Sequence, residues 1–191
     1  KAIRRQRQMC IRDRYMILKK IIKRTDSLLE KVPALYESAF PDDERIETEK
    51  FMMMIENCRS MTFYAITEDN EFCGMAVIWE LGICRYLLYL AVLEEKRNQN
   101  LGSMTLEQLL KESDLPIIGE VERPVNNINK RRIEFYKRNG FHIETENPVI
   151  LNEAHTHSTC VLQLIASSPL QNADECQKRV VDIVYKSMEE I

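Results

Sequence analysis

Glycine and proline are scarce in this sequence, and no stretch is rich in either. Five glycines and six prolines occur among its 191 residues. No low-complexity linker, internal repeat or shift in composition divides the chain, so the sequence offers no domain boundary. We therefore predict one domain over residues 16–191, ending in a C-terminal helix.

Long apolar runs are also missing. No uninterrupted run approaches the ~20 residues that a membrane-spanning helix needs, and the longest candidate, residues 87–92, has the length of a strand. Near the start, no basic stretch is followed by an apolar segment and a small-residue cleavage site, which argues against a secretion signal. We expect a cytoplasmic protein that has no membrane partner.

The cysteines lack the spacing of a disulfide scaffold or a zinc site. Disulfide scaffolds are shorter and denser in cysteine, and zinc sites show close pairs such as Cys-x-x-Cys. Neither pattern occurs here. The sequence instead indicates reduced thiols, several of them buried as small apolar residues, at six scattered positions: Cys10, Cys58, Cys73, Cys84, Cys160 and Cys176.

Residues 1–15 differ from the rest of the chain. They are strongly basic and have no helical or strand periodicity, and the run from Arg4 to Arg14 resembles a translation of the transposase adapter used in sequencing libraries. We interpret this segment as non-native or disordered and exclude it from the fold. The alternative is a basic arm that binds nucleic acid. Without these arginines the chain is more acidic than its net charge of −3, which argues against binding to a phosphate backbone and suits a cationic amine.

Periodicity predicts an α/β fold, with a mixed sheet covered by helices. Helical spacing follows a cap at Asp26 or Ser27, and Asn139-Gly140 is typical of a helix C-cap. The apolar stretch 84–92 favours a central strand. In order, we predict a strand at 16–22, helices from 28 and over 44–58, strands at 62–66, 72–80 and 84–92, a helix at 102–113, a strand at 116–122, a helix at 129–138, strands at 141–150 and 159–166, and a final helix over 174–188.

The segment Leu90 to Ser103 is an apolar strand, a polar loop and a helix that opens at Gly102. Such a layout directs unpaired backbone N–H groups and the positive end of a helix dipole toward one point, which suits a pyrophosphate. Gly102 would let the backbone approach the phosphates closely, and Arg97 and Ser103 add a charge and a hydroxyl. An ordinary strand–loop–helix reads the same way, so this segment alone does not decide between the two.

A second segment, from Asn129 to Phe141, is a short helix that ends in Asn-Gly-Phe. Together the two segments resemble the GNAT acetyltransferase superfamily, whose motifs read R-x-x-G-x-G/A and N-x-x-A-x-x-x-Y-x-x-x-G-F. Two positions depart from these motifs: Asn100 replaces the first loop glycine, and Arg132 replaces a small residue. The matching residues are Arg97 and Gly102 in the first motif, and Asn129, Tyr136, Gly140 and Phe141 in the second.

The resemblance implies a mostly antiparallel sheet of six to seven strands, splayed at the central strands that bind CoA. It implies transfer of an acetyl group from acetyl-CoA, as co-substrate, to an amine of a small molecule, peptide or protein by direct attack in a ternary complex, without a metal. The alternative is an acyl-CoA-binding regulatory module without turnover. Predicted cofactor-binding residues are Leu90, Ala91 and Val92 through their backbone, with Arg97, Asn98, Gln99, Asn100, Leu101, Gly102, Ser103, Asn129 and Tyr136.

Catalysis requires a base for the amine and an acid for the leaving thiolate. The resemblance assigns the acid to Tyr136, because a phenol with its ordinary pKa near ~10 carries a proton at neutral pH. For the base we predict Glu120 or Glu122, which lie two apart on one strand and so point to the same face; both also fit a solvated strand edge. His155 and His157 fit an exposed or substrate-side loop better than a metal site. The terminal helix is predicted to serve packing or an oligomer such as a homodimer.

Overall fold

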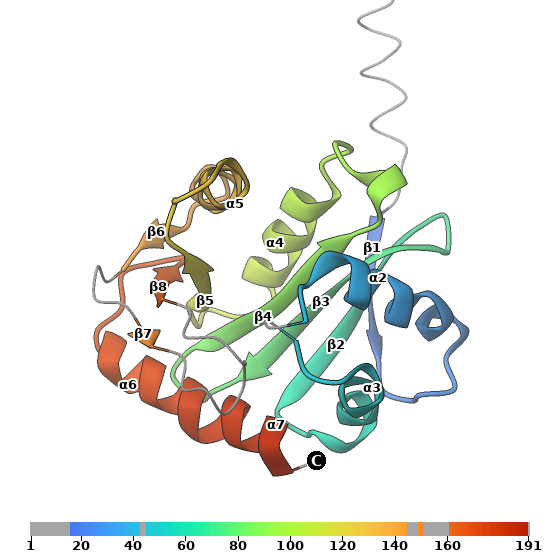
Figure 1. The fold of residues 1–191 in the computed structure, drawn as a ribbon, viewed down its shortest axis with the longest axis horizontal. Helices are drawn as coiled ribbons and strands as arrows, with labels where there is room; N and C mark the ends of the chain where they lie inside the picture. The colour runs from blue at the N-terminus through green and yellow to red at the C-terminus, as the bar shows by residue number, and fades with distance from the viewer. Residues whose placement is uncertain (1–15, 43–44, 145–148, 151–160, 191) are drawn as a thin grey trace, which may run out of the picture.

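The computed structural model describes residues 16–42, 45–144, 149–150 and 161–190. Within these ranges an eight-stranded sheet runs through the molecule in the order β1-β2-β3-β4-β5-β8-β6, with β7 paired to β8 (Figure 1). The strands are β1 (Met16–Ile21), β2 (Met61–Glu68), β3 (Glu71–Glu80), β4 (Arg85–Val92), β5 (Ile117–Glu122), β6 (His142–Ile143), β7 (Val149–Ile150) and β8 (Val161–Ala166).

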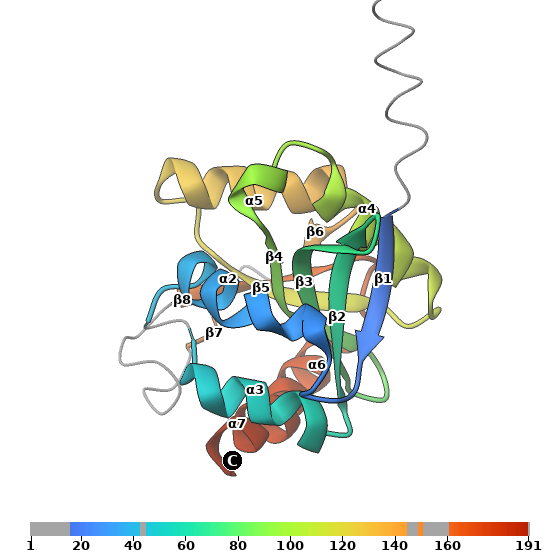
Figure 2. The same ribbon diagram turned by 90° about the vertical axis from the view of Figure 1, so that its right-hand side faces the viewer.

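Helices cover both faces of this sheet. One face packs against η1 (Ser27–Lys31), α2 (Val32–Ala39), α3 (Thr48–Asn57) and a terminal helix formed by α6 (Ala173–Arg179), the π-helical turn η3 (Val180–Tyr185) and α7 (Lys186–Glu190). The other face packs against α4 (Leu101–Lys111) and α5 (Asn127–Arg138). The terminal helix ends beside α3 in both views (Figures 1 and 2), where Lys50 Nζ donates to the carbonyl of Glu189 at 3.3 Å.

Most of the predicted elements are present. Asp26 caps the first helical turn, accepting a hydrogen bond from the N–H of Leu28 at 3.0 Å, and β4 is central, as its apolar sequence predicted. One prediction was wrong in detail: the strand expected over 141–150 is two short strands, β6 and β7. Residues 145–148 between them lie outside the described part of the chain.

The sheet opens between β4 and β5. These strands are parallel and share two registered pairs, Arg85 with Ile117 and Tyr86 with Ile118, whereas the other pairings of the described strands are antiparallel. A bulge at Leu88 interrupts the register of β4 against β3 and bends the strand where the two partners diverge. The mixed, splayed sheet predicted from the resemblance is therefore confirmed.

Candidate active site

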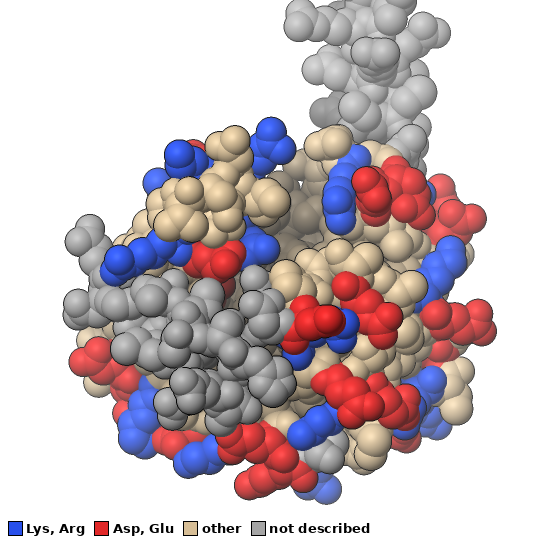
Figure 3. Space-filling view, in the orientation of Figure 1, with Lys and Arg blue, Asp and Glu red and all other residues tan. Residues whose placement is uncertain are grey.

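A cleft of about 630 Å³ occupies the opening between β4 and β5. Its walls come from β4, the loop after β4, the start of α4, β5, α5 and the terminal helix, and Phe40 and Arg45 also line it. In the space-filling view the hollow between α5 and α4 has basic side chains on its rim (Figure 3). Lys96, Arg97 and Arg132 are among the residues that line the cleft.

The loop before α4 has an unusual backbone. Asn98 and Asn100 both adopt the left-handed region, with φ of 61° and 66°, a conformation that asparagine tolerates better than most residues. Asn100 thus adopts a backbone conformation that glycine, the residue it replaces in the motif, also takes readily. The first intrahelical hydrogen bond runs from Met104 N to the carbonyl of Asn100 at 3.0 Å. The N–H groups of residues 101–103 therefore have no acceptor within the helix, and they lie at the end of α4 that borders the cleft.

Side chains hold this loop in place. Arg97 Nε donates to the carbonyl of Val92 at 3.3 Å, and Gln99 Nε2 donates to the carbonyl of Glu95 at 3.2 Å. Lys96 pairs with the buried carboxylate of Glu68 at 3.2 Å, and that hydrogen bond raises the pKa of the Lys96 ammonium. The loop is therefore preorganised next to the N-terminus of a helix, an arrangement that suits an anion.

Gly102 has a packing role that the sequence did not reveal. A Cβ added at this position would lie 3.2 Å from Cζ of Phe135 on α5. The missing side chain thus allows α4 to approach α5. Close approach of phosphates was the reason given for glycine from the sequence, and the contact with Phe135 supplies a second one.

The three β4 residues predicted to pair with a cofactor through their backbone do not all face the same edge of the strand. The N–H of Leu93 donates to the carbonyl of Cys73 on β3 at 2.9 Å, so the carbonyl of Val92, in the same peptide unit, points away from β3. By alternation the polar groups of Leu90 also face the open edge. Leu90 and Val92 line the cleft, whereas the carbonyl of Ala91 lies against Gly74 of β3.

Tyr136 is fixed by the way in which α5 ends. The N–H of Phe141 donates to the carbonyl of Tyr136 at 3.0 Å and that of Gly140 to the carbonyl of Lys137 at 3.1 Å, with Gly140 at a φ of 87°. This is a Schellman motif, and the ring of Phe141 packs on the ring of Tyr136, 5.5 Å between centroids. The predicted C-cap is confirmed. Tyr136 lines the cleft, and burial raises the pKa of its phenol to about 12.

Glu120 faces the cleft from β5 and is held by two phenols. Tyr86 Oη donates to Glu120 Oε2 at 2.9 Å and Tyr185 Oη donates to the same oxygen at 2.5 Å. Burial raises the pKa of the Glu120 carboxyl, and the hydrogen bonds from Tyr185 and Tyr86 oppose that rise. A carboxylate with a raised pKa that faces a cleft accepts a proton more readily than an exposed glutamate does.

Glu122, two residues further along β5, also lines the cleft. Its Oε2 lies 3.4 Å from Arg132 Nη1 on α5, and both side chains are about one-third exposed. Arg132 is one of the two residues that depart from the motifs, and here its charge is balanced by Glu122. The ion pair leaves Glu120 as the carboxylate of the pair that has no cationic partner among the described residues.

Three predicted residues do not line the cleft: Ala91, Gln99 and Asn129. Asn129 is buried, and its side-chain amide donates to the carbonyl of Arg123 at 3.1 Å, which ties the start of α5 to the preceding loop. His155 and His157 fall outside the described residues. The remaining predicted residues that line the cleft are Arg97, Asn98, Asn100, Leu101, Gly102, Ser103, Glu120, Glu122 and Tyr136, with Leu90 and Val92.

The sequence did not reveal Tyr86 and Tyr185. Tyr86 lies in an apolar strand and Tyr185 in an amphipathic helix, so each one reads as a core residue. The terminal helix was assigned to packing or an oligomer, but it also contributes Tyr185 and Met188 to the cleft. No local signal links these positions to Glu120, since they lie 34 and 65 residues from it in sequence.

Comparison with known proteins finds one family model that matches part of the chain. Residues 59–143 match the family model described as an acetyltransferase (GNAT) domain. No curated protein matches the sequence. Among the described residues, no helix is long and apolar enough to cross a membrane.

Solved structures share the fold over most of the chain. A Bacteroides thetaiotaomicron protein described as a GNAT-family acetyltransferase is 25% identical with a TM-score of 0.80, covering 88% of this chain and 98% of that one. Arabidopsis thaliana Naa50, in complex with the bisubstrate analogue CoA-Ac-MVNAL, is 19% identical (TM-score 0.57; 80% and 98% covered). An aminoglycoside 6′-N-acetyltransferase complexed with coenzyme A is 15% identical (TM-score 0.61; 83% and 99% covered).

Proposed function

We propose that this chain, in which residues 59–143 match a GNAT acetyltransferase domain, is an N-acetyltransferase that transfers the acetyl group of acetyl-CoA to an amine by direct attack in a ternary complex. The observation that carries the proposal is the cleft between β4 and β5. It brings a freed strand edge, a helix N-terminus, a protonated phenol and a partly buried carboxylate to one place.

The residues present fit acetyl-CoA as co-substrate. The N–H groups of residues 101–103, with Arg97 on the preceding loop, suit the charge of a pyrophosphate. The backbone of Leu90 and the N–H of Val92, whose carbonyl already accepts from Arg97, face the open edge and suit the amides of a pantetheine arm. Two of the structural neighbours contain coenzyme A or an analogue of it, which supports the same assignment here.

Acetyl-CoA would supply a thioester, whose C–S bond breaks as the bond from the amine nitrogen to the acetyl carbon forms. Glu120 accepts a proton from the acceptor ammonium, because only the neutral amine has a free electron pair. Tyr136 keeps its proton at neutral pH, since burial holds its pKa near about 12, and it donates that proton to the departing sulfur. The second proton lost by the nitrogen restores the phenol, so charge and protons balance.

The acceptor is an amine of a small molecule, peptide or protein. The neighbours span this range: one is bound to an analogue that carries the peptide MVNAL, and another acts on aminoglycosides by its description. For this chain, a carboxylate at the centre of the cleft favours an acceptor that arrives as a cation.

A non-catalytic acyl-CoA-binding module is the competing function, and Asn100 and Arg132 are the residues that suggest it. Both have a structural account: Asn100 adopts the left-handed backbone that the motif needs, and Arg132 pairs with Glu122. Calorimetry with acetyl-CoA, followed by a free-thiol assay across a panel of primary amines, separates the two functions. The enzyme releases CoA in an amine-dependent way; binding without amine-dependent thiol release on any acceptor would identify the module.

A further inference from the structure

We propose that Tyr86 and Tyr185 are positioning residues for the reaction: their hydroxyls hold one oxygen of Glu120 so that the other oxygen faces the acceptor amine. The inference rests on the proposed function, because it takes Glu120 as the base. It gives the C-terminal helix, which carries Tyr185, a part in catalysis.

The hydrogen bonds at Glu120 are one-sided. Both phenols donate to Oε2, at 2.9 Å from Tyr86 and 2.5 Å from Tyr185. In the described ranges no side chain or backbone group donates to Oε1, although Glu120 lines the cleft. Two donors on one oxygen fix the rotation of the carboxylate, and the second oxygen is left as the one that an incoming ammonium can reach.

The chemistry of the two donors suits a base. A guanidinium at the same place would stabilise the carboxylate strongly and lower its proton affinity, whereas neutral phenols satisfy a desolvated oxygen with less of that effect. Burial raises the pKa of both Tyr86 and Tyr185 above the ordinary range, so each one stays a donor throughout the physiological pH range. The nearby charges, Glu122 on β5 and Arg132 on α5, pair with each other.

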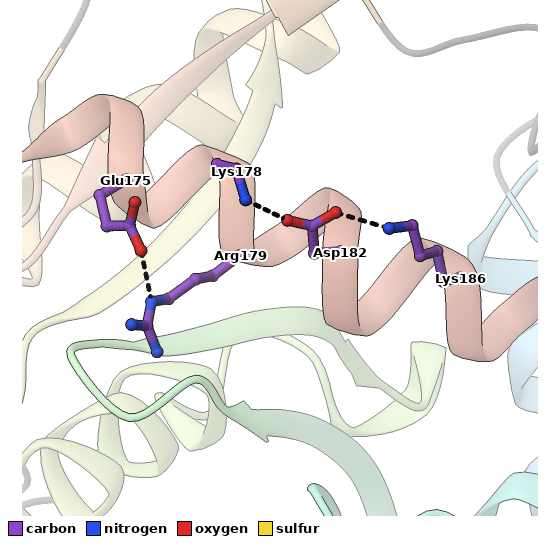
Figure 4. Close-up of polar contacts among 5 residues, drawn as sticks. All are labelled: Glu175, Lys178, Arg179, Asp182 and Lys186. Carbon is purple, nitrogen blue, oxygen red and sulfur yellow. Dashed lines mark hydrogen bonds and ion pairs between the residues drawn. The ribbon is translucent and has the colours of Figure 1, made fainter.

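The terminal helix is anchored so that Tyr185 reaches β5. Arg179 Nη1 donates to the carbonyl of Leu81, in the turn between β3 and β4, at 2.8 Å, while its Nε pairs with Glu175 at 2.9 Å. Along the exposed side, Asp182 bridges Lys178 and Lys186 at 2.6 and 2.7 Å (Figure 4). Pairs at this spacing support a helix.

Between those contacts the helix changes its winding. Residues Val180–Tyr185 form a π-helical turn, a feature that is rare and recurs at functional sites. Both Val184 and Tyr185 are buried although they are neighbours in sequence, so the wide turn lets the helix pack on the core through Val184 while Tyr185 reaches Glu120. Packing by itself would be served by an apolar residue at 185.

The kinetic test uses Tyr185→Phe and Tyr86→Phe in the full chain, with an acceptor amine that the wild type acetylates. Each variant should lose kcat by roughly tenfold, less than the complete loss of a base, with an unchanged KM for acetyl-CoA. Because the phenols stabilise the charged carboxylate, the acidic limb of the pH–kcat profile should move to higher pH. A loss that is uniform across pH, or none, would overturn the proposal.

The matched control is Tyr64→Phe. Tyr64 is a buried tyrosine whose hydroxyl donates to Glu112 Oε2 at 2.5 Å, on the other face of the sheet and outside the cleft. Tyr64→Phe, like the two test variants, removes a phenol hydroxyl that donates to a glutamate carboxylate. We expect its kcat and pH profile to match those of the wild type, and an equal fall in all three variants would attribute the effect to lost packing instead.

A second measurement is independent of turnover. The pKa of the Glu120 carboxyl is followed by ¹³C NMR of protein labelled at glutamate carboxyls, with its signal identified by its absence in Glu120→Gln. The pKa should be higher in Tyr185→Phe and in Tyr86→Phe than in the wild type. An unchanged value would overturn the positioning role even in a protein that releases thiol, and a raised value would support it even if every amine failed as acceptor.

Discussion

β4 pairs with β3 along one edge and with β5 along the other, and these two pairings contribute different properties to the protein. We call the first the paired joint and the second the open joint. Toward β3, the strand shares seven registered pairs, and the side chains of β3 are almost wholly buried. Toward β5 it shares two pairs, and the freed edges line a cleft that contains Glu120 and Tyr136. The paired joint contributes stability. The open joint contributes a desolvated site, because β4 and β5 forgo the sheet hydrogen bonds that a longer pairing would form. Substitutions on the two sides should therefore change different properties.

The largest effect is expected from the paired side. Phe63 on β2 is 1% exposed and lies in the main core, so Phe63→Ala should lower the free energy of unfolding by about 3–5 kcal/mol. The affinity of the folded protein for acetyl-CoA should stay unchanged. Denaturant unfolding and calorimetry measure the two quantities.

Thr62→Ala on the same strand is the control for Phe63→Ala. Thr62 is only half-buried, so its loss should cost under about 1 kcal/mol. If Phe63→Ala weakened acetyl-CoA binding tenfold in protein that is still folded, the two joints would not be separable.

Glu120→Gln, on the open side, should lower turnover without lowering the stability of the fold. Turnover should fall by about 10²-fold through loss of the base, more than in Glu122→Gln and most clearly at lower pH, where more of the amine must be deprotonated. Equal, small losses in both variants would move the base to water or to the substrate.

The same substitution should raise stability in a pH-dependent way. Burial raises the pKa of the Glu120 carboxyl, so above the ordinary pKa of glutamate the folded state retains a proton that the unfolded chain has released. Rising pH then lowers the stability of the wild type across that window. Glu120→Gln removes this dependence, and its gain in Tm over the wild type should grow from pH 4 to pH 8. A Tm difference that is constant over pH would contradict the raised pKa.

The smallest effect concerns Gly102, where packing and phosphate approach predict different outcomes. Gly102→Ala brings a Cβ to 3.2 Å from Phe135, and we expect a loss of acetyl-CoA affinity of a few-fold at most, since a ring can shift by tenths of an ångström. Phe135→Leu should restore the affinity if the contact with the ring is the cause. A loss that the second substitution leaves unchanged would assign the glycine to the phosphates, which a double-mutant cycle resolves.

Local patterns explain why much of this fold could be predicted. The left-handed backbone at Asn100, the cap at Gly140 and the central place of β4 all follow from residue types and near neighbours. The pairing of Arg132 with Glu122, the contact of Gly102 with Phe135 and the two phenols on Glu120 depend on segments that meet only after folding. The hydrogen bond by which the Asn129 side chain holds the loop before α5 is another contact that the sequence did not reveal.

The most direct test of the central claim, that the open joint is a catalytic centre with Tyr136 as its acid, is the single-turnover rate of Tyr136→Phe. The ring and the Schellman motif remain in this variant, so it should fold and bind acetyl-CoA as the wild type does. Its rate of acetyl transfer should fall by about 10²-fold, the scale for loss of a positioned acid. A rate equal to that of the wild type, with chemistry shown to be the slow step, would contradict the account.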